Sequence, residues 1–135
     1  MNEAGPVGDG ELEGLFAAFR GKSLALAVSG GADSIALMVL IARWLKAAGN
    51  SQSPPVVLTV DHGLRPEAGA EARAVGMLAA NLGLLHKVLP WRGTKPKSGL
   101  QQAARTARYR LLAEELERRV RRGEDKRILV LAHTL

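Results

Sequence analysis

Residues 23–34 read SLALAVSGGADS, and this stretch decides the fold. Its first part, Ser23–Ser29, carries small and branched apolar residues without a charge, as a buried strand does. The strand stops at Gly30–Gly31, and the run from Ser34, IALMVLIARWLKAA, has the length and the apolarity of a helix packed against a sheet. We therefore predict a strand, a polar loop reading SGGADS, and a helix.

The rest of the chain continues this alternation of strands and helices. Further strands are predicted at Val56–Val60, Leu85–Leu89 and Arg127–Ala132, and helices at Glu11–Phe19, from Ser34 to near Gly49, at Pro66–Asn81 and at Leu100–Arg122. Short apolar strands between helices are typical of an α/β fold, a parallel sheet with helices on both faces. Ligands of such sheets bind beyond the carboxyl ends of the strands, where the polar motifs of this chain fall.

Composition narrows the class of protein. With 47% hydrophobic and 24% charged residues, the 135-residue chain has the make-up of a globular domain. Its longest apolar run, Ile35–Ala42, is far shorter than the roughly 20 residues of a membrane span, so no membrane association is expected. The chain has no cysteine, which excludes disulfides and thiolate metal sites and fits a cytoplasmic location.

The loop SGGADS has the chemistry of a pyrophosphate cradle. Gly30 and Gly31 lack Cβ atoms, so they can adopt positive φ and bring backbone N–H groups close to an anion. The start of the following helix favours an anion at the same place. A carboxylate beside a phosphate is repulsive unless a cation lies between them, so Asp33 predicts Mg²⁺.

The sequence of this region has three other interpretations. In the first, the two glycines after the strand form a tight turn and bind nothing. Ala27–Gly31 nearly matches the G-x-S-x-G nucleophile elbow of a serine hydrolase, with His133 as its downstream histidine, but that motif leaves Asp33 and Ser34 unexplained. Gly21-Lys22-Ser23 resembles the end of a Walker A loop, yet a helix precedes it and a strand follows, which is the wrong order.

Basic residues gather in one part of the chain. Residues 92–110 contain no acidic residue and carry six cations, which equals the net charge of +6 of the whole chain. They are Arg92, Lys95, Lys97, Arg105, Arg108 and Arg110. Arg105, Arg108 and Tyr109 share one helix face, where two guanidiniums indicate an anionic partner or else a solvated face. The later arginines, at 118–122, alternate with glutamates and are interpreted as ordinary surface.

The loop SGGADS resembles the SGGxDS loop of the N-type ATP pyrophosphatases, also called the PP-loop family. Four further motifs, in order, resemble the tRNA(Ile)-lysidine synthetases of that family: VDHGLRPEAGAEA at Val60–Ala72, W-x-G-x-K-P at Trp91–Pro96, GLQQAARTARYRLL at Gly99–Leu112, and LAHTL at Leu131–Leu135. The resemblance covers about residues 22–135. It implies a Rossmann-like PP-loop domain, of the adenine nucleotide alpha hydrolase type.

The resemblance also implies a reaction and its partners. The C2 oxygen of the wobble cytidine in tRNA(Ile) with a CAU anticodon attacks the α-phosphorus of ATP and expels pyrophosphate, and the amino group of free lysine then displaces AMP to give lysidine. We expect ATP as substrate, Mg²⁺, and a cytoplasmic enzyme; a homodimer is compatible with the resemblance. Residues 1–21 are expected to be a leader with a short helix, and 22–135 a PP-loop domain that is incomplete at its carboxyl end.

Residue roles follow from the same resemblance. The implied nucleotide-binding residues are Ser29, Gly30, Gly31, Ala32, Asp33, Ser34 and Val60, with Asp33 as metal ligand and Val60 beside the adenine. The implied catalytic residues are Asp33, Asp61, Arg65, Arg105, Arg108 and His133. His86 is interpreted as structural. A nucleotide-binding module without catalysis and a serine hydrolase remain the alternatives.

Overall fold

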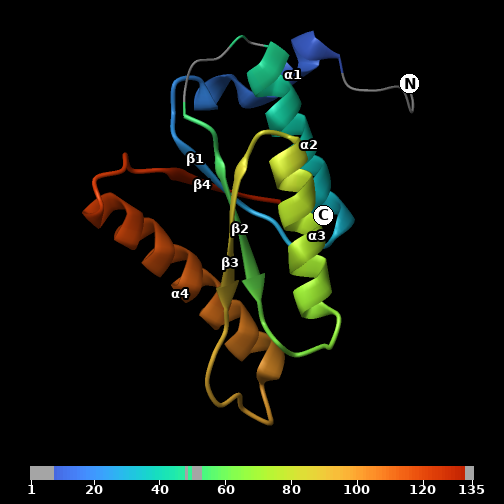
Figure 1. Ribbon diagram of the computed structural model, residues 1–135, viewed down its shortest axis with the longest axis vertical. Helices are drawn as coiled ribbons and strands as arrows, with labels where there is room; N and C mark the ends of the chain where they lie inside the picture. The colour runs from blue at the N-terminus through green and yellow to red at the C-terminus, as the bar shows by residue number, and fades with distance from the viewer. Residues whose placement is uncertain (1–7, 48, 50–52, 133–135) are drawn as a thin grey trace.

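Four parallel strands form one sheet in this computed structural model, which describes residues 8–47, 49 and 53–132 (Figure 1). They are β1 (Leu24–Ala27), β2 (Val56–Asp61), β3 (Leu85–Pro90) and β4 (Ile128–Leu131), in the order β3-β2-β1-β4. Each neighbouring pair is parallel, as predicted. The chain moves outward from β1 to β3 and then returns to the other side of β1. The winding therefore reverses at β1, the place where such sheets hold ligands.

Helices cover both faces of the sheet, which confirms the predicted α/β class (Figure 1). One face carries α1 (Asp9–Phe16), the 3-10 turn η1 (Ala17–Phe19), α2 (Ala32–Ala47) and α3 (Ala68–Asn81), and the other carries α4 (Leu100–Arg121). Side chains of β1 alternate between these layers: Leu26 packs in the α1–α2–α3 core, whereas Ala27 packs in the α4 core with Leu112. No helix in the described ranges is both long and apolar enough to span a bilayer.

The helix after the loop begins earlier than the sequence predicted. α2 starts at Ala32, two residues before the expected Ser34, because the carbonyl of Gly31 already accepts the first helical hydrogen bond, from the Ile35 N–H at 3.1 Å. Asp33 and Ser34 therefore belong to the first turn of α2. The N–H groups of this turn have no acceptor within the helix.

The reason for glycine at position 30 differs from the one that the sequence suggested. Neither Gly30 nor Gly31 is among the residues with positive φ, so that explanation is wrong. Instead, α3 lies so close that a Cβ at Gly30 would stand 3.2 Å from the Cβ of Glu71. Gly30 is small because another helix packs against it.

Buried charge joins α4 to the sheet, contrary to the interpretation of these residues as surface. Glu115 is 1% exposed and receives hydrogen bonds from Lys87 of β3 at 3.1 Å and from Arg119 at 2.8 Å, with Arg118 also paired to it. Arg119 and Arg127 both pair with Glu124 at 3.4 Å. Burial pushes the pKa of Glu115 upward, but the hydrogen bonds from Lys87 and Arg119 outweigh it, so the pKa lies below the ordinary glutamate value.

Gly30→Ala should lower the free energy of unfolding by about 1 kcal/mol, because the new methyl group forces α3 away from the loop. Gly14→Ala is the matched control: Gly14 lies in α1 with nothing within 4 Å of its would-be Cβ, so this change should stabilise by about 0.5 kcal/mol. Urea unfolding of both variants measures the difference. Equal effects of the two substitutions would contradict the close approach of α3.

Glu115→Gln should destabilise the fold by about 2 kcal/mol, since it leaves cations around a buried site without their carboxylate. Glu117→Gln removes the same charge from the same helix, at a side chain 70% exposed, and should change stability by less than about 0.5 kcal/mol. Chemical denaturation compares the two. A Glu115→Gln variant as stable as the Glu117→Gln variant would show that the buried pairs do not stabilise α4.

The stabilisation from Glu115 should disappear in acid. Its folded-state pKa is lowered, so its contribution is full above the ordinary glutamate pKa and is lost as the pH falls through the lowered value. The stability difference between the unaltered chain and Glu115→Gln should therefore shrink with falling pH. His86, whose pKa burial also lowers, affects both proteins equally and cancels in this difference. A difference that stays constant from neutral pH into strong acid would contradict the assigned pairing.

Candidate functional site

Three cavities meet at Ser29, just beyond the carboxyl end of β1. The α4 cavity, of 540 Å³, lies between the sheet and α4; the α3 cavity, of 250 Å³, lies toward α3; and the Asp33 cavity, of 300 Å³, lies at the start of α2. Two of the predicted nucleotide-binding residues each border two of these cavities. Gly31 borders the α3 cavity and the Asp33 cavity, and Val60 borders the α4 cavity and the α3 cavity. The structure thus brings the loop and the end of β2 together.

The α4 cavity exists because β2 extends further than β1. The ladder between them ends at Ala27 and Leu58, followed by one more bond from the Val28 N–H to the Leu58 carbonyl at 3.0 Å. Beyond it, β2 continues to Asp61 without β1 beside it. Val28, Leu58 and Val60 line an apolar part of the resulting cavity, which suits a flat ring.

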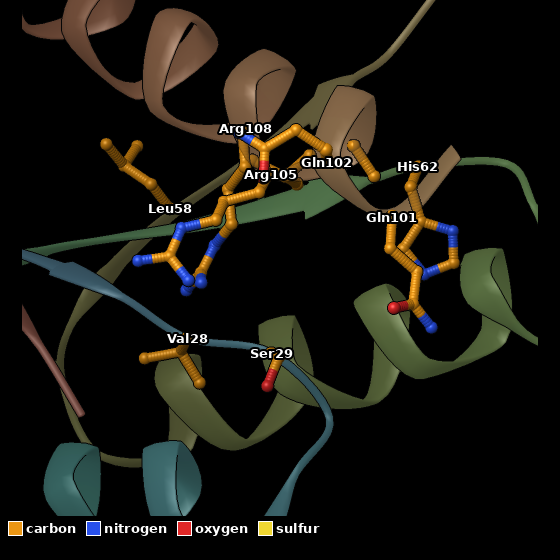
Figure 2. A pocket seen from close by; sticks show the side chains of 10 residues that line it. Val28, Ser29, Leu58, His62, Gln101, Gln102, Arg105 and Arg108 are labelled. Atoms are coloured by element: carbon orange, nitrogen blue, oxygen red, sulfur yellow. The ribbon is translucent and has the colours of Figure 1, made fainter. Parts of the chain in front are cut away.

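Two arginines of α4 project into this cavity. Figure 2 shows the side chains of Arg105 and Arg108 reaching from α4 toward Val28 and Ser29. The Arg105 guanidinium also lies 5.7 Å from the ring centre of Tyr109, and Arg108 borders the Asp33 cavity as well. Among the described residues, neither arginine forms an ion pair with a carboxylate. The sequence prediction of one shared face is confirmed for Arg105 and Arg108, and their convergence suits an anion.

The loop itself is held by the hydroxyl of Ser34, a residue that is only 7% exposed. This oxygen accepts the Ser29 N–H at 3.0 Å and lies 3.0 Å from the Ser29 hydroxyl. It also lies 3.1 and 3.3 Å from the carbonyl oxygens of Ser29 and Gly31, to which it can donate. The Gly31 N–H donates to the Ser29 hydroxyl at 3.2 Å. Ser34 therefore shapes the loop from inside, while Ser29 lies at its surface; phosphate contact by either stays a prediction.

Asp33 is exposed in the first turn of α2 and borders the same cavity as Ser29 and Arg108. Within the described part of the chain, no group of three or more His, Asp or Glu side chains is arranged to hold a metal. A single carboxylate still fits Mg²⁺, which commonly takes one or two carboxylates and completes its shell with phosphate oxygens and water. The donor set at Asp33 therefore fits a metal that arrives with a phosphate ligand.

The loop after β2 is shaped by its own side chains. Asp61 accepts the Gly63 N–H at 3.0 Å through Oδ1, which makes an Asx turn, and Gly63 itself has a positive φ of 66°. His62 accepts the Leu64 N–H through Nδ1 at 3.0 Å and borders both the α4 and the α3 cavity. Asp61 is not among the residues that line the three cavities, whereas Arg65 lines the α3 cavity. A catalytic role for either stays a prediction.

Among the site residues that sequence reasoning missed are three with polar side chains on helices. Gln101 and Gln102 line the α4 cavity from the first turn of α4, and Glu71 lines the α3 cavity. The available signal was that the two glutamines stand three and four residues before Arg105, which is one helical turn. Nothing in the local sequence indicated that Glu71 would reach the loop, because its partner Gly30 is 41 residues earlier in the chain.

Two predicted histidine roles have different outcomes. His133 lies outside the described residues. His86 packs against Gly76 and its Nε2 lies 3.0 Å from the Thr59 hydroxyl, which fits a structural residue. The nucleophile-elbow interpretation gains no support, because no non-glycine residue in the described ranges has the positive φ that marks a strained turn.

Comparison with known proteins places the chain in a family. Over 92 residues it is 63% identical to the tRNA(Ile)-lysidine synthase of Rhodopseudomonas palustris, covering 68% of this chain and 26% of that protein. Over 110 residues it is 56% identical to the tRNA(Ile)-lysidine synthase of Bradyrhizobium diazoefficiens, covering 81% of this chain and 30% of that protein. The chain thus spans less than a third of the length of these curated relatives.

A solved structure shares the fold. The U34-tRNA thiolase NcsA from Methanococcus maripaludis, with its [4Fe-4S] cluster, matches with a TM-score of 0.62 at 18% identity, over 85% of this chain and 39% of that one. The family model described as the PP-loop domain matches residues 8–135. Together with the loop at Ser29–Ser34 between β1 and α2, this match shows that the chain belongs to the PP-loop domain family.

Proposed function

We propose that this chain is the ATP-binding part of a tRNA(Ile)-lysidine synthase. The single observation that carries the proposal is the convergence of the SGGADS loop and the arginines of α4 on adjoining cavities at Ser29. The identity of 63% to a tRNA(Ile)-lysidine synthase supports the choice of this activity among PP-loop activities.

In the proposed complex the adenosine of ATP occupies the α4 cavity and its phosphates extend into the Asp33 cavity. The apolar lining by Val28, Leu58 and Val60 supports the first placement, with backbone groups of Val60 available to the adenine. The N–H groups at the start of α2 support the second, because they offer hydrogen bonds to phosphate oxygens. Arg108 borders both cavities and is placed to contact the phosphate between them.

The proposed metal is Mg²⁺ at Asp33, where it would neutralise the charge of the departing pyrophosphate. Asp33 would supply one carboxylate oxygen, and the phosphates themselves would supply others. Arg105 and Arg108 would supply further electrostatic stabilisation, because in the proposed complex the cavity that they line is next to the α-phosphate, where negative charge builds up.

The proposed reaction joins two steps. The cytidine C2 oxygen forms a bond to the α-phosphorus as the bond to pyrophosphate breaks, and the amino nitrogen of lysine then bonds to C2 as AMP departs with that oxygen. The chain's residues would orient the triphosphate for in-line attack and hold the arginines around it. The cytidine of tRNA(Ile), free lysine and a cytoplasmic setting belong to this proposal, as does a domain that continues beyond residue 135.

Asp33→Asn should lower pyrophosphate release at least about 100-fold, because the proposed metal loses its protein ligand. The measurement uses this chain extended to the length of its relatives, with ATP, Mg²⁺, lysine and unmodified tRNA(Ile). Asp125→Asn is the matched control, since Asp125 is exposed in the segment before β4, at the opposite end of the strands, and should leave the rate unchanged.

The outcomes separate the competing functions. Release that needs the tRNA, lysine and Asp33 supports a lysidine synthase. ATP binding without any release, in the extended chain, would replace the enzyme with a nucleotide-binding module. Release that survives Asp33→Asn at full rate would refute the metal assignment.

A further inference from the structure

Glu71 places a negative charge beside the loop that is proposed to bind phosphates. Its side chain packs on Gly30, where a Cβ would stand 3.2 Å from the Glu71 Cβ and 3.4 Å from its carboxyl carbon. It also lines the α3 cavity together with Ser29, Gly30 and Gly31. An isolated carboxylate in this place would repel phosphate, so its presence needs an explanation.

The partner of Glu71 is Arg65, whose Nη2 donates to Oε1 at 2.7 Å. The two side chains are 41% and 54% exposed, and such exposed pairs contribute at most about 1 kcal/mol to stability. The pair is therefore of little use for folding. Its effect is on the position of Arg65. Arg65 comes from the loop between β2 and α3, and the pair ties it to Glu71, which is fixed on the first turn of α3.

We propose that Glu71 is a positioning residue that holds the Arg65 guanidinium beside Gly30 and Gly31, ready to contact a phosphate bound by the loop. The inference rests on the proposed ATP site. The stem of Glu71 rests on the loop, and its carboxylate holds the guanidinium in the same cavity. A guanidinium that is already oriented loses less side-chain freedom when the anion arrives. This also accounts for Gly30, because a larger residue there would push Glu71 away.

The direction in which one substitution changes the affinity for ATP separates this role from a simple effect of charge. Glu71→Gln removes a negative charge near the phosphates, so charge alone predicts tighter ATP binding. Loss of positioning predicts weaker binding, since Arg65 is then free to turn toward solvent. If Glu71 acts only through Arg65, the weakening must vanish once Arg65 has been replaced.

The test is a double-mutant cycle on the dissociation constant of MgATP, measured by calorimetry with the same extended chain as the pyrophosphate assay, and each substitution is compared with that unaltered extended chain. Glu71→Gln and Arg65→Gln should each weaken binding about fivefold, and adding Glu71→Gln to Arg65→Gln should cause no further weakening. Glu114→Gln is the matched control: Glu114 pairs with Arg110 on α4 at 3.4 Å, both are 51% exposed, and neither lines the three cavities. Urea unfolding of all variants confirms that each is folded at the assay temperature.

The outcomes distinguish this inference from the function on which it rests. An unaltered chain that does not bind MgATP overturns the proposed ATP site and the role of Glu71 with it. An unaltered chain that binds, together with a Glu71→Gln variant that binds equally or more tightly, overturns the positioning role alone. Weakening by Glu71→Gln that persists in the Arg65→Gln background also overturns it, because Glu71 then acts independently of Arg65.

Discussion

The buried hydroxyl of Ser34 fixes the turn between β1 and α2, and the rest of the candidate site is arranged around that turn. Its oxygen accepts the Ser29 N–H at 3.0 Å and reaches the carbonyls of Ser29 and Gly31. A hydroxyl has one proton, so it can satisfy only one of these carbonyls at a time, while its acceptor role toward Ser29 persists. Ser29 borders all three cavities. The hydrogen bonds around the Ser34 hydroxyl therefore fix the corner at Ser29 where the three cavities meet.

A second constraint, the unequal length of neighbouring strands, turns this corner into a site. β2 extends beyond the last pairing of β1, so the sheet has a step at its carboxyl end. α4 covers the step on one face and the loop leading to α3 borders it on the other. In a parallel sheet the connections leave from this same edge, so the loops after β1 and β2 meet here by topology alone. The chemistry is then decided by which side chains those connections carry.

The sequence was sufficient for features that depend on local pattern. Uncharged β1 and the apolar run of α2 predicted the sheet and its covering helices, and the spacing of Arg105 and Arg108 predicted that they share a face. Features that depend on packing between distant segments could not be obtained in this way. Glu115 looked like one more residue in an alternating charged helix, but it faces Lys87 of β3, 28 residues earlier. The glycine at position 30 suggested a positive φ, which Gly30 does not have; a side chain is excluded there by the close approach of Glu71.

The two halves of α4 show how this chain treats arginine, and the contrast bears on function. In the second half, Arg118 and Arg119 pair with Glu115, and Arg121 lies 4.0 Å from Glu117. In the first half, among the described residues, Arg105 and Arg108 have no carboxylate partner although they converge on one cavity. Two guanidiniums brought together without a counter-charge repel each other, a cost that an anionic ligand removes. The same helix pairs Arg118 and Arg119 where it meets the amino end of the sheet and leaves Arg105 and Arg108 without a carboxylate, among the described residues, at the carboxyl end. At that end the first turn of α2 also has N–H groups without an acceptor in the helix.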